Sequence, residues 1–241
     1  MRFGTEASHL DVPFRRTPRP VVATRLLASC LQTAAGSPVP EQELWDWPVS
    51  RRFQELLRIA AETNGARQHA VVECSRPECQ APMEVELDLM ALRSETLVDS
   101  FCFGPAPGVE LEMRVPTGRD QLRYAQQLGE DPLELARELV ESGGAAFERE
   151  WLPQLEAALR EQDPLTALEL VAVCPTCGQQ SSIEFDLEAF LLRQLERCQR
   201  ELLDAVHRIA SAYHWSEAEI LALPEHRRTW YLDRIDREAL A

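Results

Sequence analysis

Four cysteines of this chain occur as two close pairs that are far apart in the sequence. Cys74 and Cys79 have the spacing Cys-x4-Cys, and Cys174 and Cys177 have the spacing Cys-x2-Cys. Short spacings of this kind present two thiolates to one tetrahedral metal ion, and two such pairs complete a four-cysteine zinc site. The pattern therefore predicts that the two pairs together bind one structural Zn²⁺ ion.

The two pairs also share their flanking sequence. A valine, Val71 or Val171, stands three residues before the first cysteine of each pair. An apolar-Glu-apolar-Asp-Leu string begins six residues after the second cysteine, at Val85 or at Ile183. Because alternating apolar and polar residues are typical of half-buried strands, each pair lies between two expected strands. We expect the two halves to be related by a pseudo-twofold around one ion, with residues 80–173 looped out between them.

A site closed by four cysteines has consequences for chemistry. With all four tetrahedral positions filled by protein, no open position remains for a water nucleophile. The sequence also contains no phosphate-binding glycine loop, no His-Glu-x-x-His motif and no evident set of nucleophile, base and orienting group. We therefore expect a structural metal and no enzyme activity. Two alternatives stay open: four reduced cysteines without metal, and a metalloenzyme with one of these cysteines unliganded and a further cysteine or histidine nearby.

Composition restricts the expected partners. The chain has 241 residues, a formal net charge of −15 and 25 basic residues, all of them Arg. Because nucleic-acid binding normally rests on a basic surface, we expect no nucleic acid as partner; a zinc-ribbon nucleic-acid-binding regulator with a local Arg patch is the alternative. A small-molecule substrate is not expected either. No apolar run approaches bilayer length and residues 1–20 lack a signal-peptide core, so we expect no membrane and a cytoplasmic location.

Apolar periodicity predicts the elements that position the cysteines. Spacings of three and four residues are typical of amphipathic helices, and strict alternation is typical of strands. Helices are expected over 21–33, 48–64, 121–143 (in two pieces), 147–160 and 187–213. Strands are expected over 83–89 and 168–173, with a hairpin over 101–115 whose five-residue loop is 104–108. Thr117 and Asp120, and likewise Ser216 and Glu219, have the spacing of capping boxes at helix starts.

Together these elements predict an α+β fold. One antiparallel sheet would be fixed by a discontinuous four-cysteine zinc ribbon and flanked by N-terminal and C-terminal helical subdomains. The expected segments are a mobile arm (1–20), an N-terminal helical segment (21–66), the first zinc knuckle and a hairpin (67–120), a helical insertion (121–166), the second zinc knuckle (167–186) and a C-terminal helical segment (187–241).

The other three cysteines are interpreted as buried thiols. Cys30 and Cys198 fall on the apolar stripes of expected helices, and Cys102 stands between Phe101 and Phe103 in an expected strand. Reduced cysteine commonly behaves as a small hydrophobic residue in such places.

Arginine and aromatic residues gather near the C-terminus. This combination is typical of residues that anchor protein–protein interfaces. The candidate contact residues are Trp215, Arg227, Arg228, Trp230 and Tyr231. The alternative is a helix that packs these aromatic residues into the core and leaves its arginines in water.

The stretch from Asp163 to Ile235 combines several short motifs. They are Asp163-Pro164-Leu165 before a strand, Cys174-Pro-Thr-Cys177-Gly178, Phe185-Asp186 at the start of the long helix, and Trp215-Ser216-x-x-Glu219-Ile220-x-x-Leu223-Pro224. This stretch resembles the baseplate hub assembly proteins of contractile-tailed phages, and is most similar to relatives encoded with phage-tail-like contractile injection systems.

The resemblance implies a non-enzymatic, chaperone-like role. A member of this family would assist or join the central baseplate, and its partners would be hub or spike proteins of the contractile particle. It would then be found in the bacterial cytoplasm or incorporated into the tail-like particle. The resemblance covers about the last third of the chain and the turn at 116–120, and does not extend to the first 66 residues.

Overall fold

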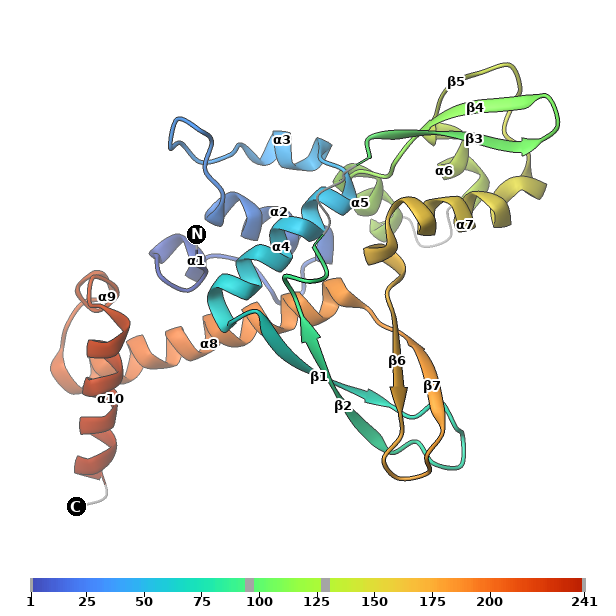
Figure 1. Cartoon of the computed structure of the whole chain (residues 1–241). Helices are drawn as coiled ribbons and strands as arrows, with labels where there is room; N and C mark the ends of the chain where they lie inside the picture. The colour runs from blue at the N-terminus through green and yellow to red at the C-terminus, as the bar shows by residue number, and fades with distance from the viewer. Residues whose placement is uncertain (1, 94–97, 127–130, 240–241) are drawn as a thin grey trace.

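The computed structural model describes residues 2–93, 98–126 and 131–239. Over these residues the protein is a mixed α/β structure with a helical body from which smaller parts project (Figure 1). The α-helices are α1 (Ala7–Leu10), α2 (Arg19–Cys30), α3 (Glu41–Asp46), α4 (Val49–Asn64), α5 (Gly118–Gln126), α6 (Pro132–Leu139), α7 (Leu152–Gln162), α8 (Leu187–Tyr213), α9 (Glu217–Leu221) and α10 (Glu225–Ala239). Short 3₁₀ helices are η1 (Arg149–Trp151) and η2 (Pro164–Ala167).

The strands in the described ranges form three separate antiparallel sheets. They are the hairpin of β1 (Arg67–Glu73) and β2 (Pro82–Asp88), the three-stranded sheet of β3 (Ser100–Ala106), β4 (Val109–Arg114) and β5 (Val140–Gly143), and the hairpin of β6 (Glu169–Val173) and β7 (Gln180–Glu184). The single sheet expected from the sequence is therefore wrong. Alternation along a strand shows that one face is buried, but it does not show which strand lies next to it.

The helical body is built from α2, α4 and the first half of α8. Its core is continuous with the inner faces of β1–β2 and β6–β7, because residues such as Leu56, Val72, Leu170 and Leu191 belong to one buried cluster. The predicted helices over 21–33, 48–64 and 187–213 are confirmed to within a few residues at their ends. The long apolar stripe of α8 thus buries its first half in this body.

A buried arginine joins the helices of the body. Arg52 of α4 is 2% exposed, and its guanidinium donates to the carbonyl oxygens of Leu44 (2.8 Å) and Pro20 (2.9 Å) and to Oγ1 of Thr24 (2.9 Å). A Cβ atom at Gly118 would lie 2.5 Å from Nη1 of Arg52, so the start of α5 also needs this glycine. Burial lowers the pKa of Arg52 to about 10, and the negative charge of Glu188 opposes only part of this effect.

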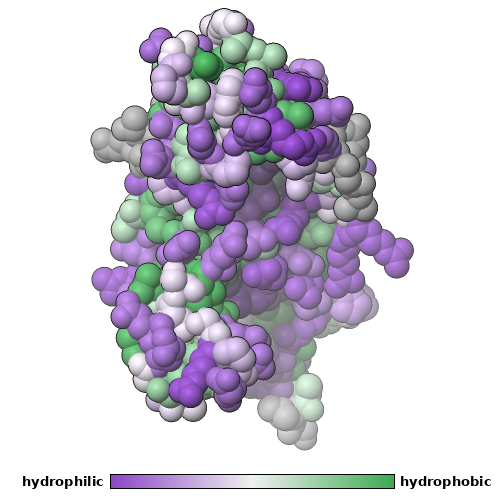
Figure 2. Space-filling model, turned by 90° about the vertical axis from the view of Figure 1, so that its right-hand side faces the viewer, coloured by the Kyte–Doolittle hydropathy of each residue, from purple (hydrophilic) through white to green (hydrophobic). Residues whose placement is uncertain are grey.

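A second lobe consists of β3–β4–β5 with α6 and α7. It has its own core, in which Phe103, Phe147 and Trp151 contact one another beside Leu111 and Met113. Figure 2 shows this lobe above the paired hairpins, with a recess between them and a mainly hydrophilic surface on this face. The helical insertion expected over 121–166 is therefore a lobe that shares its core with the hairpin before it.

Two local expectations for this lobe are wrong. The predicted five-residue loop at 104–108 is shorter, because β3 continues to Ala106 with a register irregularity after Phe103. The helix predicted to reach residue 143 ends at Leu139, and Val140–Gly143 instead pairs with β4. Tertiary contact with β4 overrides the helical pattern there. Residues 127–130, also within that predicted helix, lie outside the described ranges.

The helix start predicted at Thr117 is confirmed, since α5 begins at Gly118. The Asp120 carboxylate accepts hydrogen bonds from the backbone N–H and the hydroxyl of Thr117, both at 2.8 Å. It also pairs with Nη1 of Arg114 at 2.6 Å. This carboxylate thus connects the last strand of the β3–β4 hairpin to the following helix.

The first twenty residues do not form the mobile arm that their composition suggests. Phe3, His9 and Val12 are 1%, 0% and 4% exposed. Nε2 of Gln199 in α8 donates to the carbonyl oxygens of His9, Leu10 and Val12 at 2.9, 3.1 and 3.0 Å. The buried apolar residues are irregularly spaced, so no periodicity predicts their burial, and contacts with α2, α4 and α8 order this segment.

The imidazole of His9 holds the N-terminal turn. Nδ1 accepts hydrogen bonds from the backbone N–H groups of Gly4 (3.0 Å), Thr5 (3.1 Å) and Glu6 (3.2 Å). Nε2 lies 3.3 Å from the carbonyl oxygen of Ser29 and donates to it. An Nδ1 atom that accepts hydrogen bonds cannot carry a proton, and burial lowers the pKa of His9 below 6.5.

We expect the free energy of unfolding to fall in acid because of His9. The unfolded chain binds a proton near pH 6.5 and the folded chain does not, so this contribution is complete above pH 6.5 and is lost as pH falls toward the lower folded pKa. Urea unfolding at about pH 7.5 and about pH 5 measures the difference. His9→Gln should reduce the pH dependence, while His207→Gln, at an exposed position, should keep it. Equal pH dependence in His9→Gln and the unmodified protein would contradict this role.

The end of α8 forms a further part with α9 and α10, here called the C-terminal head. Its core contains Leu202, Val206, Ile209 and Ile220. The predicted capping box at Ser216 and Glu219 is confirmed, with each side chain bonded to the backbone N–H of the other residue. His214 ends α8 in the left-handed region (φ 57°), which turns the chain toward α9.

Candidate metal centre

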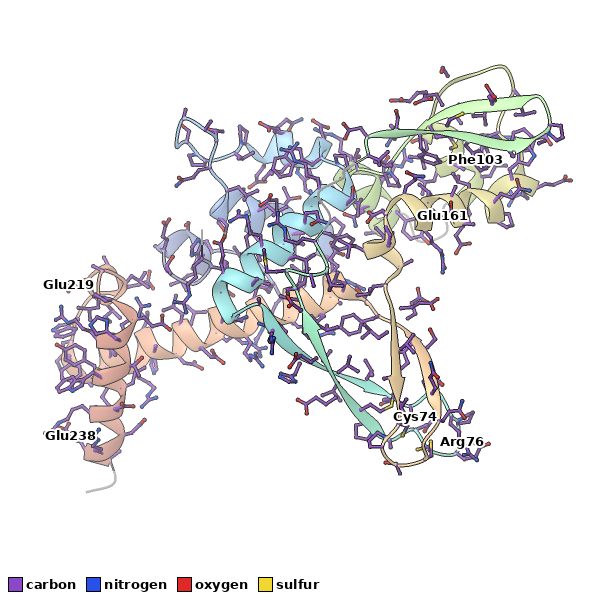
Figure 3. The ribbon with its side chains drawn as sticks, in the orientation of Figure 1. Cys74, Arg76, Phe103, Glu161, Glu219 and Glu238 are labelled. Carbon is purple, nitrogen blue, oxygen red and sulfur yellow. The ribbon has the colours of Figure 1, made fainter. Side chains whose placement is uncertain are left out.

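The two cysteine pairs lie at the ends of the two hairpins that project from the body. Figure 3 shows Cys74 and Arg76 at the far end of this arm, away from the labelled residues of the other parts. In each hairpin the first cysteine directly follows the first strand. Its backbone N–H donates across the turn, from Cys74 to the oxygen of Ala81 (3.0 Å) and from Cys174 to that of Gln179 (2.9 Å). The same hydrogen bond thus shapes both turns.

Left-handed residues complete both turns. Gly178 has φ 72° and its N–H donates to the oxygen of Cys174 at 2.8 Å. Gln80 has φ 47° at the corresponding place after Cys79. A glycine adopts this conformation at little cost, which explains the Cys-Gly dipeptide of the second pair. In the longer first turn a non-glycine residue takes the same conformation.

The four Sγ atoms form one compact group. All lie within 4.8 Å of one another, and the pairs Cys74–Cys177 and Cys79–Cys174 are separated by 3.7 and 3.8 Å. A tetrahedral metal with bonds of about 2.3 Å to sulfur needs S···S edges of about 3.8 Å. A disulfide would need about 2.05 Å, and all four cysteines are free. The residues present therefore fit a tetrahedral metal ion and could hold one.

Both close pairs join one hairpin to the other. In both, the first cysteine of one pair contacts the second cysteine of the other pair, which is the arrangement that a twofold relation produces. Cys74 and Cys174 are 3% and 1% exposed, while Cys79 and Cys177 are half-buried. Ligands from both hairpins would thus surround one ion, with one side of the site open to the surface.

The local groups set the proton affinity of the thiols. Backbone N–H groups, first that of Cys177, lower the pKa of Cys174 to about 6. A backbone N–H from Ala81 favours the Cys79 thiolate, but removal from water and the neighbouring thiols raise the pKa of Cys79 to about 11. The group cannot hold four thiolates without a cation, so metal binding must release protons and must weaken in acid.

Two serines beside the cysteines were not predicted from the sequence. Ser181 is 2% exposed, and its Oγ lies 4.0 Å from Sγ of Cys74. Ser75 Oγ donates to Ser181 Oγ at 2.8 Å, which links the two hairpins a second time. Serine has no spacing rule comparable to that of the cysteine pairs, so only the folded chain reveals this contact.

The other three cysteines lie away from the group. Cys30 is buried, as predicted, and Cys198 is half-buried with its thiol 2.9 Å from Oδ1 of Asn64. The prediction for Cys102 is wrong, because this residue is exposed. Strand alternation explains the error: Phe101 and Phe103 face the core, so the residue between them must face water.

The five candidate contact residues all lie in the C-terminal head but differ in exposure. Trp230 is 61% exposed, and Arg227 on the same helix is also exposed. Trp215 and Tyr231 are half-buried and pack edge to face with ring centroids 4.9 Å apart. Arg228 is 8% exposed, so it is not available as a surface contact. It belongs to α10, and its side chain is buried because it reaches back to the carbonyl oxygens of Leu221, the last residue of α9, and Leu223.

Comparisons with known proteins gave no relative. No family model, no curated protein and no solved structure matches this chain. No helix in the described part of the chain is both long and apolar enough to cross a bilayer.

Proposed function

We propose that this protein is a non-enzymatic assembly factor or structural component in the baseplate of a contractile, phage-tail-like particle. In this proposal a Zn²⁺ ion bound by Cys74, Cys79, Cys174 and Cys177 clamps the two hairpins as one discontinuous zinc ribbon. Helical subdomains lie on both sides of it, and partners are recognised by protein–protein contact.

The compact sulfur group supports zinc. Thiolates are soft ligands, and a four-thiolate tetrahedron is typical of zinc or of an iron site. The two hairpin turns resemble zinc knuckles in spacing and in their shared hydrogen bonds. Four protein ligands complete the tetrahedron, so the ion supplies cross-linking and no reaction. Residues far apart in the chain are thereby fixed as one rigid arm.

The observation that carries the baseplate assignment is the Trp-Ser-x-x-Glu-Ile-x-x-Leu-Pro motif of residues 215–224. It supplies the capping box of α9 and the buried Ile220 of the C-terminal head. The head lies at the far end of α8 from the body (Figure 1). Trp230 on its helix α10 is exposed. A motif that builds a separate part of the protein with an exposed aromatic residue favours a role in binding a partner. In this proposal Trp230 and Arg227 contact the partner, and Trp215 and Tyr231 pack behind them.

We expect Trp230→Ala to reduce co-purification with hub and spike subunits of the particle encoded nearby. Loss of a large exposed aromatic anchor typically costs about 2 kcal/mol of binding free energy, or roughly a thirtyfold weaker complex. Tyr124→Ala is the matched control, because Tyr124 is 59% exposed on α5. Recovery unchanged by Trp230→Ala would reject the head as the contact, and a genome without sheath, tube and baseplate genes beside this one would reject the function.

The alternative, a nucleic-acid-binding zinc-ribbon regulator, requires a basic face near the metal. The β6–β7 hairpin contains Glu169 and Glu184 and no arginine. A zinc ion with four thiolates would add further negative charge. These charges favour the baseplate proposal over the regulator, and salt-sensitive retention of the protein on DNA would reverse that preference.

A further inference from the structure

A cavity of about 580 Å³ lies between the N-terminal residues, the helical body and the C-terminal head. Its walls come from residues 2–5, the end of α4, the middle of α8 and the start of α10. Apolar groups on the walls include Phe3, Leu202 and Leu232. This volume suits a small ligand or the end of a peptide. The cavity is distinct from the four-cysteine group.

Four charged side chains line the cavity, and three of them have partners. Arg2 and Glu225 form a two-armed ion pair, with Nη1 to Oε2 at 2.7 Å and Nη2 to Oε1 at 3.2 Å. Oε1 of Glu201 lies 3.8 Å from Nε of Arg197 on the preceding turn of α8. Arg228 has no carboxylate within ion-pair distance in the described ranges. It is therefore the cation of the cavity that lacks a counter-ion.

The guanidinium of Arg228 is only partly used. Nη1 donates to the carbonyl oxygens of Leu221 (3.4 Å) and Leu223 (3.0 Å). Nε and Nη2 have no hydrogen-bond partner among the described residues, although the side chain is 8% exposed. Neither nitrogen is fully buried, so both are accessible from the cavity. An oxyanion there can accept charge-assisted hydrogen bonds from two guanidinium nitrogens.

A second donor on the wall is also incomplete. Asn64, at the end of α4, accepts the thiol hydrogen of Cys198 through Oδ1 at 2.9 Å. Its Nδ2 is buried and has no hydrogen-bond partner within the described residues. Buried polar groups are seldom left without a partner. The polar wall of the cavity therefore has accessible unused donors on Arg228 and a buried one on Asn64 behind it.

We propose that this cavity binds a monocarboxylate with an aliphatic tail, through a bidentate hydrogen bond to Arg228. The charges of the two arginines and two glutamates in the lining cancel. We therefore expect the cavity to bind a ligand with one negative charge better than a ligand with two. The apolar walls fit an aliphatic tail. A free organic acid and the C-terminal carboxylate of a peptide with an apolar last residue share this chemistry. The proposal does not depend on the baseplate function or on the metal.

Calorimetry with two pairs of probes tests the proposal on the full-length protein. The first pair is hexanoate and hexanamide, and the second is acetyl-Ala-Leu with a free or an amidated C-terminus. At least one carboxylate should bind saturably and raise the melting temperature, and its neutral partner should do neither. Binding of hexanoate alone would indicate an organic acid as the source, and binding of the free dipeptide alone would indicate a peptide end.

Two variants with opposite expected effects on ligand affinity make the test more specific. Arg228→Lys keeps a charge that can reach the carbonyl oxygens but loses the planar fork, so affinity should fall about tenfold. Glu201→Gln removes a negative charge from the cavity and should strengthen binding. Arg237→Lys, at an exposed position of α10 outside the cavity, should change nothing. The proposal is overturned if no carboxylate binds at millimolar concentration, if the amides bind equally well, or if folded Arg228→Lys binds with full affinity.

Discussion

Replacing Cys174 with serine is expected to separate the two hairpins of the arm and to give the largest loss of stability of any single change at the metal centre. Cys174 is 1% exposed, and its Sγ lies 3.8 Å from that of Cys79 in the other hairpin. A structural zinc ion supplies on the order of 10 kcal/mol of binding free energy that is coupled to folding. A hydroxyl is a poor replacement for a thiolate, so most of this contribution should be lost.

Elemental analysis and thermal unfolding measure this effect together. The native protein should contain about one zinc per chain, and Cys174→Ser should contain far less and unfold at a lower temperature. Chelation of the native protein should reproduce the lower temperature. Cys102→Ser is the matched control, because that thiol is exposed in another sheet. Native protein with well under one zinc per chain, or full metal content in Cys174→Ser, would contradict the zinc clamp.

Replacing Arg52 with alanine is expected to destabilise the helical body by about 3–5 kcal/mol. The change empties the site of one of the largest fully buried side chains and removes a donor from the oxygens of Leu44, Pro20 and Thr24, of which Pro20 keeps the hydroxyl of Thr24. Each buried acceptor left alone costs about 1–3 kcal/mol. The relief of a buried charge offsets part of this cost, which keeps the total below the sum of the separate losses.

Urea unfolding of Arg52→Ala and Arg51→Ala separates the contribution of buried contacts to stability from the effect of losing one positive charge. Arg51 is exposed on the same helix, with its guanidinium 3.6 Å from the ring centroid of Trp47. Its replacement removes the same charge but should cost less than about 1 kcal/mol. Equal effects of the two substitutions would show that the buried hydrogen bonds of Arg52 do not stabilise the body.

Features with a strong local signal were predicted from the sequence. The spacing and repeated flanks of the cysteine pairs indicated one group of four, and the structure places their Sγ atoms within 4.8 Å of one another. The stripe of α8 and the Ser216–Glu219 capping box are likewise local patterns, because a helix is stabilised within a few residues of itself. The identity of the metal and the baseplate role stay predictions.

Features that depend on distant contacts were missed. Residues 140–143 pair with β4 in spite of their helical pattern, and the N-terminal segment is ordered by Gln199 and by the hydrogen bonds of His9. The buried arginines could not be told from exposed ones by sequence. Arg52 and Arg51 are neighbours, yet one is in the core and the other in water.

The amino-acid sequence by itself determined which cysteines can share one ion, where the long helices run and that the chain is acidic. Each of these follows from residue type and spacing over a few turns or strands. Only the tertiary structure decided that the described strands form three sheets, that the first residues join the core and that Arg228 lines a cavity with no carboxylate partner among the described residues. These properties depend on contacts between segments that are far apart in the sequence. The free energy of such contacts depends on both segments together, so a local sequence pattern does not encode it.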